Sequence, residues 1–238
     1  LGGLTLFDQT TNKHHGTLTN MDPETDWVMD GGGALTTDGS NDHVLIPSTY
    51  GLGIASLSFF AWVKVPTTSE AGAFIKIGDY TGSSSQYGYA IGVGTNFDTA
   101  GNELVALFEH KRWITTTTAV GTDWAHVGMT IDSNGVPELW INGLSLGQFT
   151  GTNAGVPPDN KTYIGGYLKG GSYPNFRNVN AKIDDVRIYD REVSPSEVQQ
   201  LYNNGQRGIA YQRGSKLLSA PTSEVIVDVT LGNPSFLL

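Results

Sequence analysis

The sequence predicts an all-β protein, built as an antiparallel sandwich or barrel. Short apolar runs of strand length recur along the chain, and clusters of Gly, Pro, Asn, Asp or Ser separate them. The connections between these runs are too short for the crossovers that parallel strands require. Glycine accounts for 31 of the 238 residues and charged residues for only 16%, which is typical of many short strands joined by tight turns.

The first elements are an irregular edge and two strands. Residues 1–30 mix short apolar pieces with turn formers. A turn at residues 38–41 leads into a strand through Val44 and Ile46. Residues 57–64 then alternate strictly, so one side of this strand should face the core and Pro66 should end it. One side holds Leu57, Phe59, Ala61 and Val63, and the other holds Ser58, Phe60, Trp62 and Lys64.

Further runs of strand length follow at 73–80, 87–94, 103–110, 112–120, 124–132, 137–149, 161–168 and 181–190. The run at 124–132 also alternates, with Ala125, Val127, Met129 and Ile131 on one side. The clearest local signal is Asn142-Gly143 between apolar residues, because a type I′ hairpin turn requires this pair. We expect the tryptophans of these runs to pack in the core or on a sheet face. They are Trp62, Trp113, Trp124 and Trp140.

A short helix is predicted directly after the last of these runs. Ser194 is the expected N-cap, Pro195 the first helical residue, and Glu197 completes a capping box. An apolar stripe follows, and Gly205 is placed to end the helix. A helix of about ten residues is marginal alone, so it should dock on the sandwich.

The chain divides into a sandwich at residues 1–205 and a C-terminal arm or linker at 206–238. The arm holds one strand-like run, Val225 to Val229. It could form an added strand, reach a neighbouring subunit, or link to a further domain. The first residue is Leu1 rather than Met, which indicates processing or a longer parent chain.

Charge and composition narrow the possible partners. The formal net charge of −9 disfavours nucleic acid, because most of the surface would repel a polyanion. No apolar run approaches the roughly 20 residues of a membrane span, so we expect no membrane insertion. The chain contains no cysteine, so disulfides do not stabilise it.

Five segments resemble the laminin-G-like and concanavalin A-like lectin/glucanase jelly-roll family in order and spacing. They are "ALTTDGSNDHVLIP", "SLSFFAWVKVP", "WAHVGMTID", "LWINGLSLG" and "AKIDDVRIYDREVSPSEVQQLYNNG". The resemblance covers roughly residues 5–205. It implies a two-sheet β-sandwich that acts as a binding or adhesion module, usually extracellular and often without catalytic activity. Such domains also occur in surface and virion proteins.

The paired acids Asp184 and Asp185 are the first candidate site. If Val186 faces the core, strict alternation places Asp184 on the same side. A buried carboxylate needs either hydrogen-bond donors or a hard cation such as Ca²⁺. The resemblance implies a structural Ca²⁺, and the candidate co-ligands from nearby turns are Asp38, Asp42 and Asp8. Both alternatives give the carboxylates an architectural role.

The second candidate site is the loop "GGYLKGGSYPNFRNVN". It places Tyr167, Tyr173, Phe176 and Arg177 among glycines and asparagines. Aromatic faces and a guanidinium group suit a glycan, and they suit a protein contact equally well. A third interpretation folds these aromatics back onto the sandwich.

Catalysis is disfavoured. A glycosidase needs two opposed carboxylates, and the E-x-D-x-x-E pattern of hydrolytic relatives is absent. No nucleophile elbow is expected either. The segment Gly143–Gly147 matches G-x-S-x-G, but it directly follows the predicted hairpin turn at Asn142-Gly143, whereas a nucleophile elbow lies at a strand-to-helix turn. We therefore predict a non-catalytic module on a cell or virion surface that attaches to a glycan or a protein. The alternative is a structural surface or capsid decoration subunit whose arm pairs with neighbours in a homo-oligomer or capsid lattice, and a glycoside hydrolase is a minor alternative.

Overall fold

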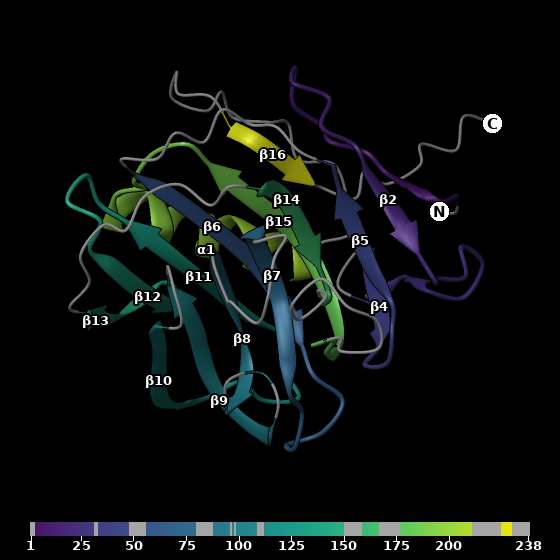
Figure 1. The fold of residues 1–238 in the computed structure, drawn as a ribbon, viewed down its shortest axis with the longest axis horizontal. Coiled ribbons are helices and arrows are strands. Elements are labelled where there is room, and N and C mark those ends of the chain that lie inside the picture. The colour runs from purple at the N-terminus through teal and green to yellow at the C-terminus, as the bar shows by residue number, and fades with distance from the viewer. Residues whose placement is uncertain are drawn as a thin grey trace.

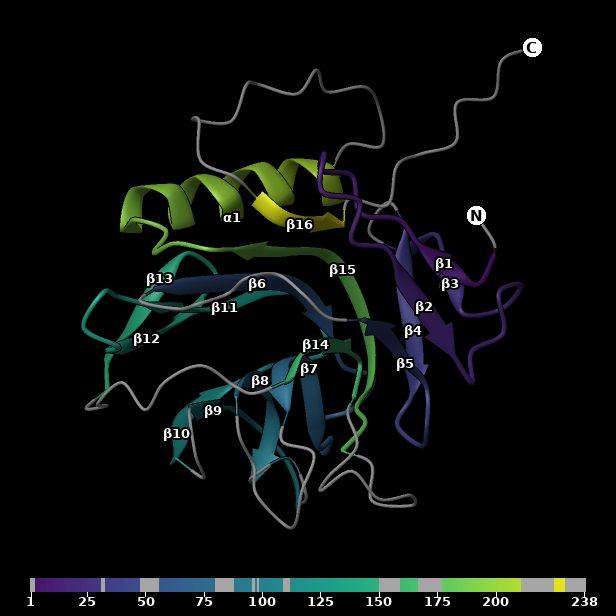
Figure 2. The same ribbon diagram turned by 45° about the horizontal axis from the view of Figure 1, so that its top comes forward.

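A computed structural model of the chain describes residues 3–30, 33–47, 56–79, 88–95, 97, 99–108, 112–149, 159–166, 177–210 and 225–229. It confirms the all-β prediction. Two antiparallel sheets pack face to face, and one helix lies on the outer side of one of them (Figure 1 and Figure 2).

Sheet A has the strand order β1-β2-β5-β14-β7-β8-β9-β10. Its strands are β1 (Thr5–Leu6), β2 (Gly16–Thr19), β5 (His43–Ile46), β14 (Asp159–Ile164), β7 (Gly72–Asp79), β8 (Tyr89–Thr95), β9 (Thr99–Phe108) and β10 (Arg112–Ala119).

Sheet B has the order β13-β12-β11-β6-β15-β4-β3, and β16 also pairs with β15. Its strands are β13 (Leu144–Gln148), β12 (Pro137–Ile141), β11 (Ala125–Ile131), β6 (Leu57–Lys64), β15 (Asn180–Tyr189), β4 (Ala34–Asp38), β3 (Trp27–Val28) and β16 (Val225–Val229).

The core between the sheets is formed by the predicted faces of β6 and β11. Phe59 and Val63 of β6 and Val127 and Met129 of β11 are fully buried in one apolar cluster. The hairpin between β12 and β13 turns at Asn142, which has φ 51°, and Gly143, which has φ 77°, as a type I′ turn requires. The two alternation patterns and the turn signal are therefore confirmed.

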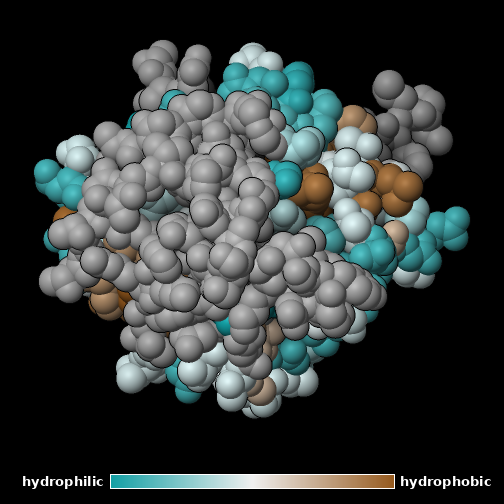
Figure 3. Space-filling view, in the orientation of Figure 1, coloured by the Kyte–Doolittle hydropathy of each residue, from teal (hydrophilic) through white to brown (hydrophobic). Residues whose placement is uncertain are grey.

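The N-terminal residues close one side of the sandwich. β1 is the outermost strand of sheet A and β3 the outermost strand of sheet B. The Trp27 indole N–H donates to the Gly3 carbonyl at 3.3 Å, which ties β3 to the start of the chain. Leu4, Phe7 and Met29 are more than half exposed here. Figure 3 shows hydrophobic residues among hydrophilic ones on this described part of the surface.

The predicted strict alternation of residues 181–190 is wrong at Asp184, because β15 contains a β-bulge. Asp184 pairs with Trp62 and Arg187 pairs with Phe60, so β15 has one residue more than β6 between these pairs. The backbone at Asp185 adopts a left-handed conformation, with φ 46°, which accommodates the extra residue. Ile183 and Val186 both belong to the core cluster as a result, and Asp184 shares the outer side of sheet B with Trp62.

Helix α1 (Pro195–Ala210) covers part of the outer face of sheet B (Figure 2). Val198 and Leu201 pack against Phe60, Trp140 and Tyr189 in a second apolar cluster. The Tyr202 ring stacks on the Trp62 indole, with centroids 5.6 Å apart and planes 19° apart. Trp62 and Trp140 therefore pack on a sheet face, as expected.

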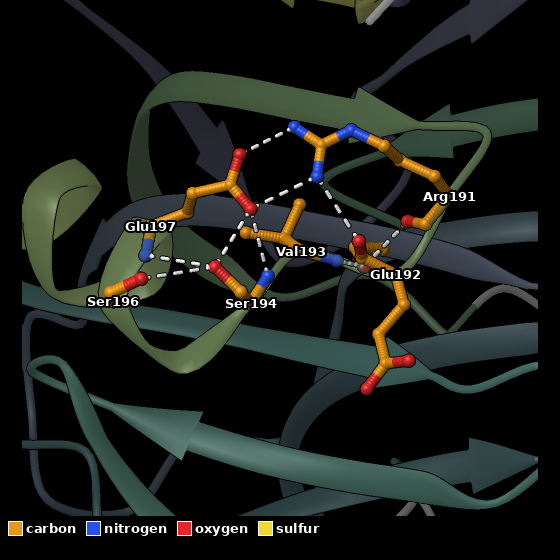
Figure 4. Close-up of polar contacts among 7 residues, drawn as sticks. Arg191, Glu192, Val193, Ser194, Ser196 and Glu197 are labelled. Carbon is orange, nitrogen blue, oxygen red and sulfur yellow. Dashed lines mark hydrogen bonds and ion pairs between the residues drawn. The ribbon is translucent and has the colours of Figure 1, made fainter. Parts of the chain in front are cut away.

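The predicted capping box forms at the start of α1 (Figure 4). The Ser194 N–H donates to Glu197 Oε2 at 2.9 Å, and the Glu197 N–H donates back to Ser194 Oγ at 3.4 Å. Arg191 adds a bidentate ion pair, with both terminal nitrogens donating to the Glu197 carboxylate at 3.0 and 2.7 Å. These contacts fix the angle at which the helix leaves β15.

The predicted end of the helix at Gly205 is wrong, because α1 continues to Ala210. The absence of a side chain at Gly205 serves packing instead. A Cβ atom there would overlap the Trp62 indole, so glycine lets the helix approach the sheet. The predicted boundary between residues 205 and 206 consequently falls inside α1.

The arm contributes an added strand to its own chain, which is the first of the three predicted alternatives. β4 pairs with β15 only from Asn180 to Ile183, before the bulge. β16 takes the same edge after the bulge, from Val186 to Tyr189. Residues 211–224 and 230–238 of the arm lie outside the described residues. No helix in the described part of the chain has the length and apolar character needed to cross a membrane.

We predict that Gly205→Ala destabilises the protein by about 1–2 kcal/mol. Helix propensity alone would stabilise α1 by about 1 kcal/mol, but the added methyl group collides with Trp62 and forces α1 away from the sheet. Urea unfolding measures the difference. The neighbouring Asn204→Ala, at an exposed position, should be neutral or slightly stabilising. A more stable Gly205→Ala protein would contradict the close approach.

Candidate functional site

The four predicted metal ligands lie in three separate local structures, and the first is a turn closed by Asp8. Its carboxylate is buried and accepts the Thr10 N–H and hydroxyl at 2.8 Å each and the His14 N–H at 2.7 Å. Its donors come from within its own loop, so Asp8 fixes the turn between β1 and β2.

Asp38 and Asp42 lie together in the turn between β4 and β5. The Asp38 N–H donates to Asp42 Oδ2 at 3.2 Å, and Asp38 Oδ1 accepts the Ser40 N–H at 2.7 Å. Burial, followed by the charge of Asp38, raises the pKa of Asp42 to about 6. These two carboxyls are the one pair of the predicted set that the structure brings together.

Asp184 lies in the bulge of β15. The Asp185 N–H donates to Asp184 Oδ1 at 2.7 Å, so the carboxyl caps its own bulge. Burial, followed by the charge of Asp185, raises the pKa of Asp184 to about 7. Asp185 itself pairs with the Arg187 guanidinium at 2.9 Å.

The arrangement does not fit a calcium centre built from these four residues. Among the described residues, no three His, Asp or Glu side chains come together as a group that could hold a metal ion. Ca²⁺ takes six to eight oxygen ligands, usually including several carboxylates. The contacts instead match the hydrogen-bonding alternative for Asp184, in which donors within the chain hold the carboxyl.

The predicted ligand loop is described only at its end. Tyr167, Tyr173 and Phe176 lie outside the described residues. Arg177 is described and is only 3% exposed. Its carbonyl accepts the Ala73 N–H at 3.2 Å, which joins the end of the loop to β7.

A continuous row of side chains crosses the outer face of sheet A. Leu45 pairs with Tyr163, Tyr163 with Lys76, Lys76 with Ala90, and Ala90 with Leu107. Most of these residues belong to an apolar cluster that is separate from the core between the sheets. We call this row the sheet A row.

The polar members of this face are withdrawn from solvent. Lys76 is 1% exposed, and its ammonium donates to the Gly78 carbonyl. The His43 ring lies 6.0 Å from the Tyr163 ring, and burial lowers the pKa of His43. The imidazole is therefore neutral at pH 7, and the face combines an aromatic ring, an imidazole and an ammonium group.

Asn178 lies beside the first residue of β7. It forms an isolated bridge with Ala73, and Gly166 leaves the space that its amide fills. Both polar atoms of this amide are buried without a hydrogen-bond partner in the described structure. A buried amide in this condition costs free energy, so a polar ligand group reaching it would be stabilised.

Sequence reasoning missed Lys76, Tyr163, His43 and Asn178. One usable signal was the lysine in "AFIKIGDY", a charge at the centre of an apolar run. Such a residue must lie on the face that does not enter the core. The pairing of Tyr163 with Lys76 was not readable, because β7 and β14 are far apart in sequence.

We predict that Asp184→Asn makes stability less dependent on pH. The ordinary pKa of this carboxyl is 3.8 and the folded value is about 7, so between these values the folded state binds more protons. Stability of the natural chain therefore falls as pH rises through this window. The variant should be up to about 4 kcal/mol more stable than the natural chain at pH 8 and equal to it near pH 4.

Thermal unfolding between pH 4 and pH 8 measures this difference. Asp123→Asn, at an exposed position, controls for the loss of one negative charge. A stability difference that stays constant across the pH range would show that Asp184 does not titrate in this way.

Solved structures share this fold. The chain is similar to a structure of botulinum neurotoxin type C, whose cell entry is described as dependent upon interaction with two ganglioside molecules. The TM-score is 0.58 and the identity 16%, over 86% of this chain and 51% of that chain. The chain is similar to a botulinum neurotoxin DC binding domain in complex with rat synaptotagmin II, at TM-score 0.53 and 15% identity over 86% and 52%. It is also similar to Trypanosoma rangeli sialidase in complex with 2,3-difluorosialic acid, at 0.60 and 15% over 82% and 30%.

The chain thus spans about half the length of the toxin domains and 30% of the sialidase, and at these identities the likeness shows the fold alone. No curated protein sequence matches the chain. A family model for the concanavalin A-like lectin/glucanases superfamily matches residues 38–199. This segment runs from the turn at Asp38 into α1 and includes most strands of both sheets. The chain therefore belongs to the concanavalin A-like lectin/glucanase superfamily and has its lectin-like jelly-roll sandwich.

Proposed function

We propose that the chain is a non-catalytic attachment module that binds a glycan through the outer side of sheet A. The observation that carries this proposal is the difference between the two sheets. Helix α1 covers part of the outer face of sheet B, whereas no described helix or strand covers the outer face of sheet A (Figure 2). The side of the sandwich that holds the sheet A row is therefore the proposed binding side.

The chemistry of this side suits a sugar. Tyr163 and His43 supply rings, Lys76 an ammonium, and Asn178 an amide without a partner. Sugars stack on aromatic faces while amides and cations bind their hydroxyls. Since these groups are buried, the first contacts with a ligand fall to the connection that follows β14. That connection contains Tyr167, Tyr173 and Phe176.

The carboxylates on this side support binding rather than hydrolysis. By alternation with Val105 and Leu107, Glu103 faces outward, and it is exposed. Among the described residues of β8, β9 and the sheet A row, Glu103 is the one carboxylate whose strand pairing puts it on this outer side. Glycoside hydrolysis needs two opposed carboxylates, so the described part of this face lacks the required pair.

The similar solved structures support a glycan or a protein as the partner. The type C toxin structure concerns interaction with gangliosides, and the DC binding domain is in complex with synaptotagmin II. We place the module outside a cell or on a virion surface, where such attachment takes place. The alternative of a decoration subunit requires the arm to pair with a neighbour, but the described strand β16 pairs within its own chain.

We predict that the full chain binds a subset of glycans on an array. Tyr173→Ala should weaken this binding about tenfold, because stacking of a sugar on an aromatic ring contributes about 1–1.5 kcal/mol. Phe7→Ala is the matched control, because Phe7 is an exposed aromatic residue directly after β1, the outermost strand of sheet A. It should leave binding unchanged.

Prolonged incubation with a bound glycan, followed by mass spectrometry, should recover it intact. Release of shortened sugars would show that the module is an enzyme. If the chain binds no glycan on the array, a glycan ligand is ruled out and a protein partner remains as the alternative.

A further inference from the structure

A second polar cluster lies on the outer face of sheet B, beyond the part that α1 covers. It consists of Asp30, Lys64, Trp124 and Lys182, and we call it the Asp30 cluster. Lys64 of β6 and Lys182 of β15 are directly paired residues. Asp30 follows β3, and Trp124 precedes β11. Three distant segments thus meet on one carboxylate.

Asp30 holds the other three side chains in place. Its Oδ2 accepts from Lys182 Nζ at 2.6 Å and from Lys64 Nζ at 3.3 Å, and its Oδ1 accepts from the Trp124 indole N–H at 3.1 Å. The hydrogen bond from Lys182 is the main cause that lowers the pKa of Asp30 to about 2. The carboxylate is therefore ionised at every pH at which the protein would be used.

The charge of this cluster is opposite to that of the whole chain. Two ammonium groups and one carboxylate sum to +1, while the chain carries −9. Like charges on directly paired strand residues destabilise a sheet, and Asp30 offsets only one of the two. A single carboxylate or sulfate monoester would neutralise the remainder.

Both lysines can reach such a group. An ammonium has three N–H donors, and Asp30 accepts one from each lysine. The lysine side chains are 32% and 35% exposed, so the remaining donors are accessible from solvent. An anion on the solvent side would form charge-assisted hydrogen bonds to both ammonium groups at once.

The surroundings of the cluster favour an anion that is part of a sugar. The half-buried Trp124 indole is fixed by Asp30 beside the ammonium groups. Thr36 pairs with Lys182, and its buried hydroxyl has no hydrogen-bond partner in the described structure. A ring that can stack and two cations are groups that recognise an acidic saccharide.

We propose that the Asp30 cluster binds the carboxylate or sulfate group of an acidic sugar. This proposal rests on the proposed function for the glycan class, but it concerns a separate site on the other sheet. The overall negative charge repels long polyanions, so a short acidic saccharide fits the site better than a highly charged polymer. In the alternative, the Asp30 cluster has only a structural role, holding the segment after β3 against sheet B, and it binds no sugar.

The test is a titration of the full chain with 3′-sialyllactose, a sulfated disaccharide from heparin, and lactose, followed by Trp fluorescence and calorimetry. We expect at least one acidic sugar to bind and lactose to bind much more weakly at this site. Lys64→Gln and Lys182→Gln should each weaken acidic-sugar binding about tenfold, and raised NaCl should weaken it in the natural chain.

Lys13→Gln is the matched control, because Lys13 is an exposed lysine in the turn between β1 and β2. It should not change the affinity. Lys182→Arg keeps the charge and should retain binding, which separates loss of the site from loss of folding. Comparing 3′-sialyllactose, which carries a carboxylate, with the sulfated disaccharide shows which anion the site accepts.

The proposal is overturned if neither acidic sugar binds, if lactose binds as well as they do, or if Lys64→Gln and Lys182→Gln behave like Lys13→Gln. Binding that is lost in Tyr173→Ala but kept in Lys182→Gln would overturn this site and leave the proposed function standing. Acidic-sugar binding that is lost in Lys182→Gln but kept in Tyr173→Ala would support this site alone.

Discussion

The extra residue in β15 is the constraint on which the architecture depends. β15 is a central strand of sheet B and pairs with β4, β6 and β16. A side-chain period of two would send either Ile183 or Val186 away from the core, and the bulge lets both enter it. The same irregularity separates the edge that β4 uses from the edge that β16 uses. Asp184 and Asp185 stabilise the bulge through a backbone hydrogen bond and an ion pair.

Close packing on the other side of sheet B follows from two glycines. A Cβ atom on Gly128 would overlap the Phe60 ring, and one on Gly205 would overlap the Trp62 indole. The Phe60 ring stacks on the imidazole of His126 at 5.4 Å, and burial lowers the pKa of His126 to about 3. The imidazole is therefore a neutral packing group. Helix α1 thus covers part of this face, and the Asp30 cluster lies on a part where its lysine side chains are about one-third exposed.

Local patterns predicted the fold well. The alternation of β6 and β11, the Asn142-Gly143 turn and the capping box at Ser194 are each determined within a few residues, so each was readable. The bulge and the continuation of α1 past Gly205 depend on partners far away in sequence, Phe60 and Trp62, and no local signal encodes them. The candidate sites were hardest to predict for the same reason. Lys64 and Lys182 come together only through strand pairing, and a carboxylate from a third segment joins them.

The register of β15 is open to a direct measurement, because the chain contains no cysteine. Single cysteines at Ile183, Asp184, Asp185 and Val186, each in the full chain, would be tested for their rate of reaction with a thiol reagent under native conditions. The bulge predicts slow reaction at the first and last of these positions and faster reaction at the two between them. Protection at every second position, as in an unbroken strand, would contradict the account.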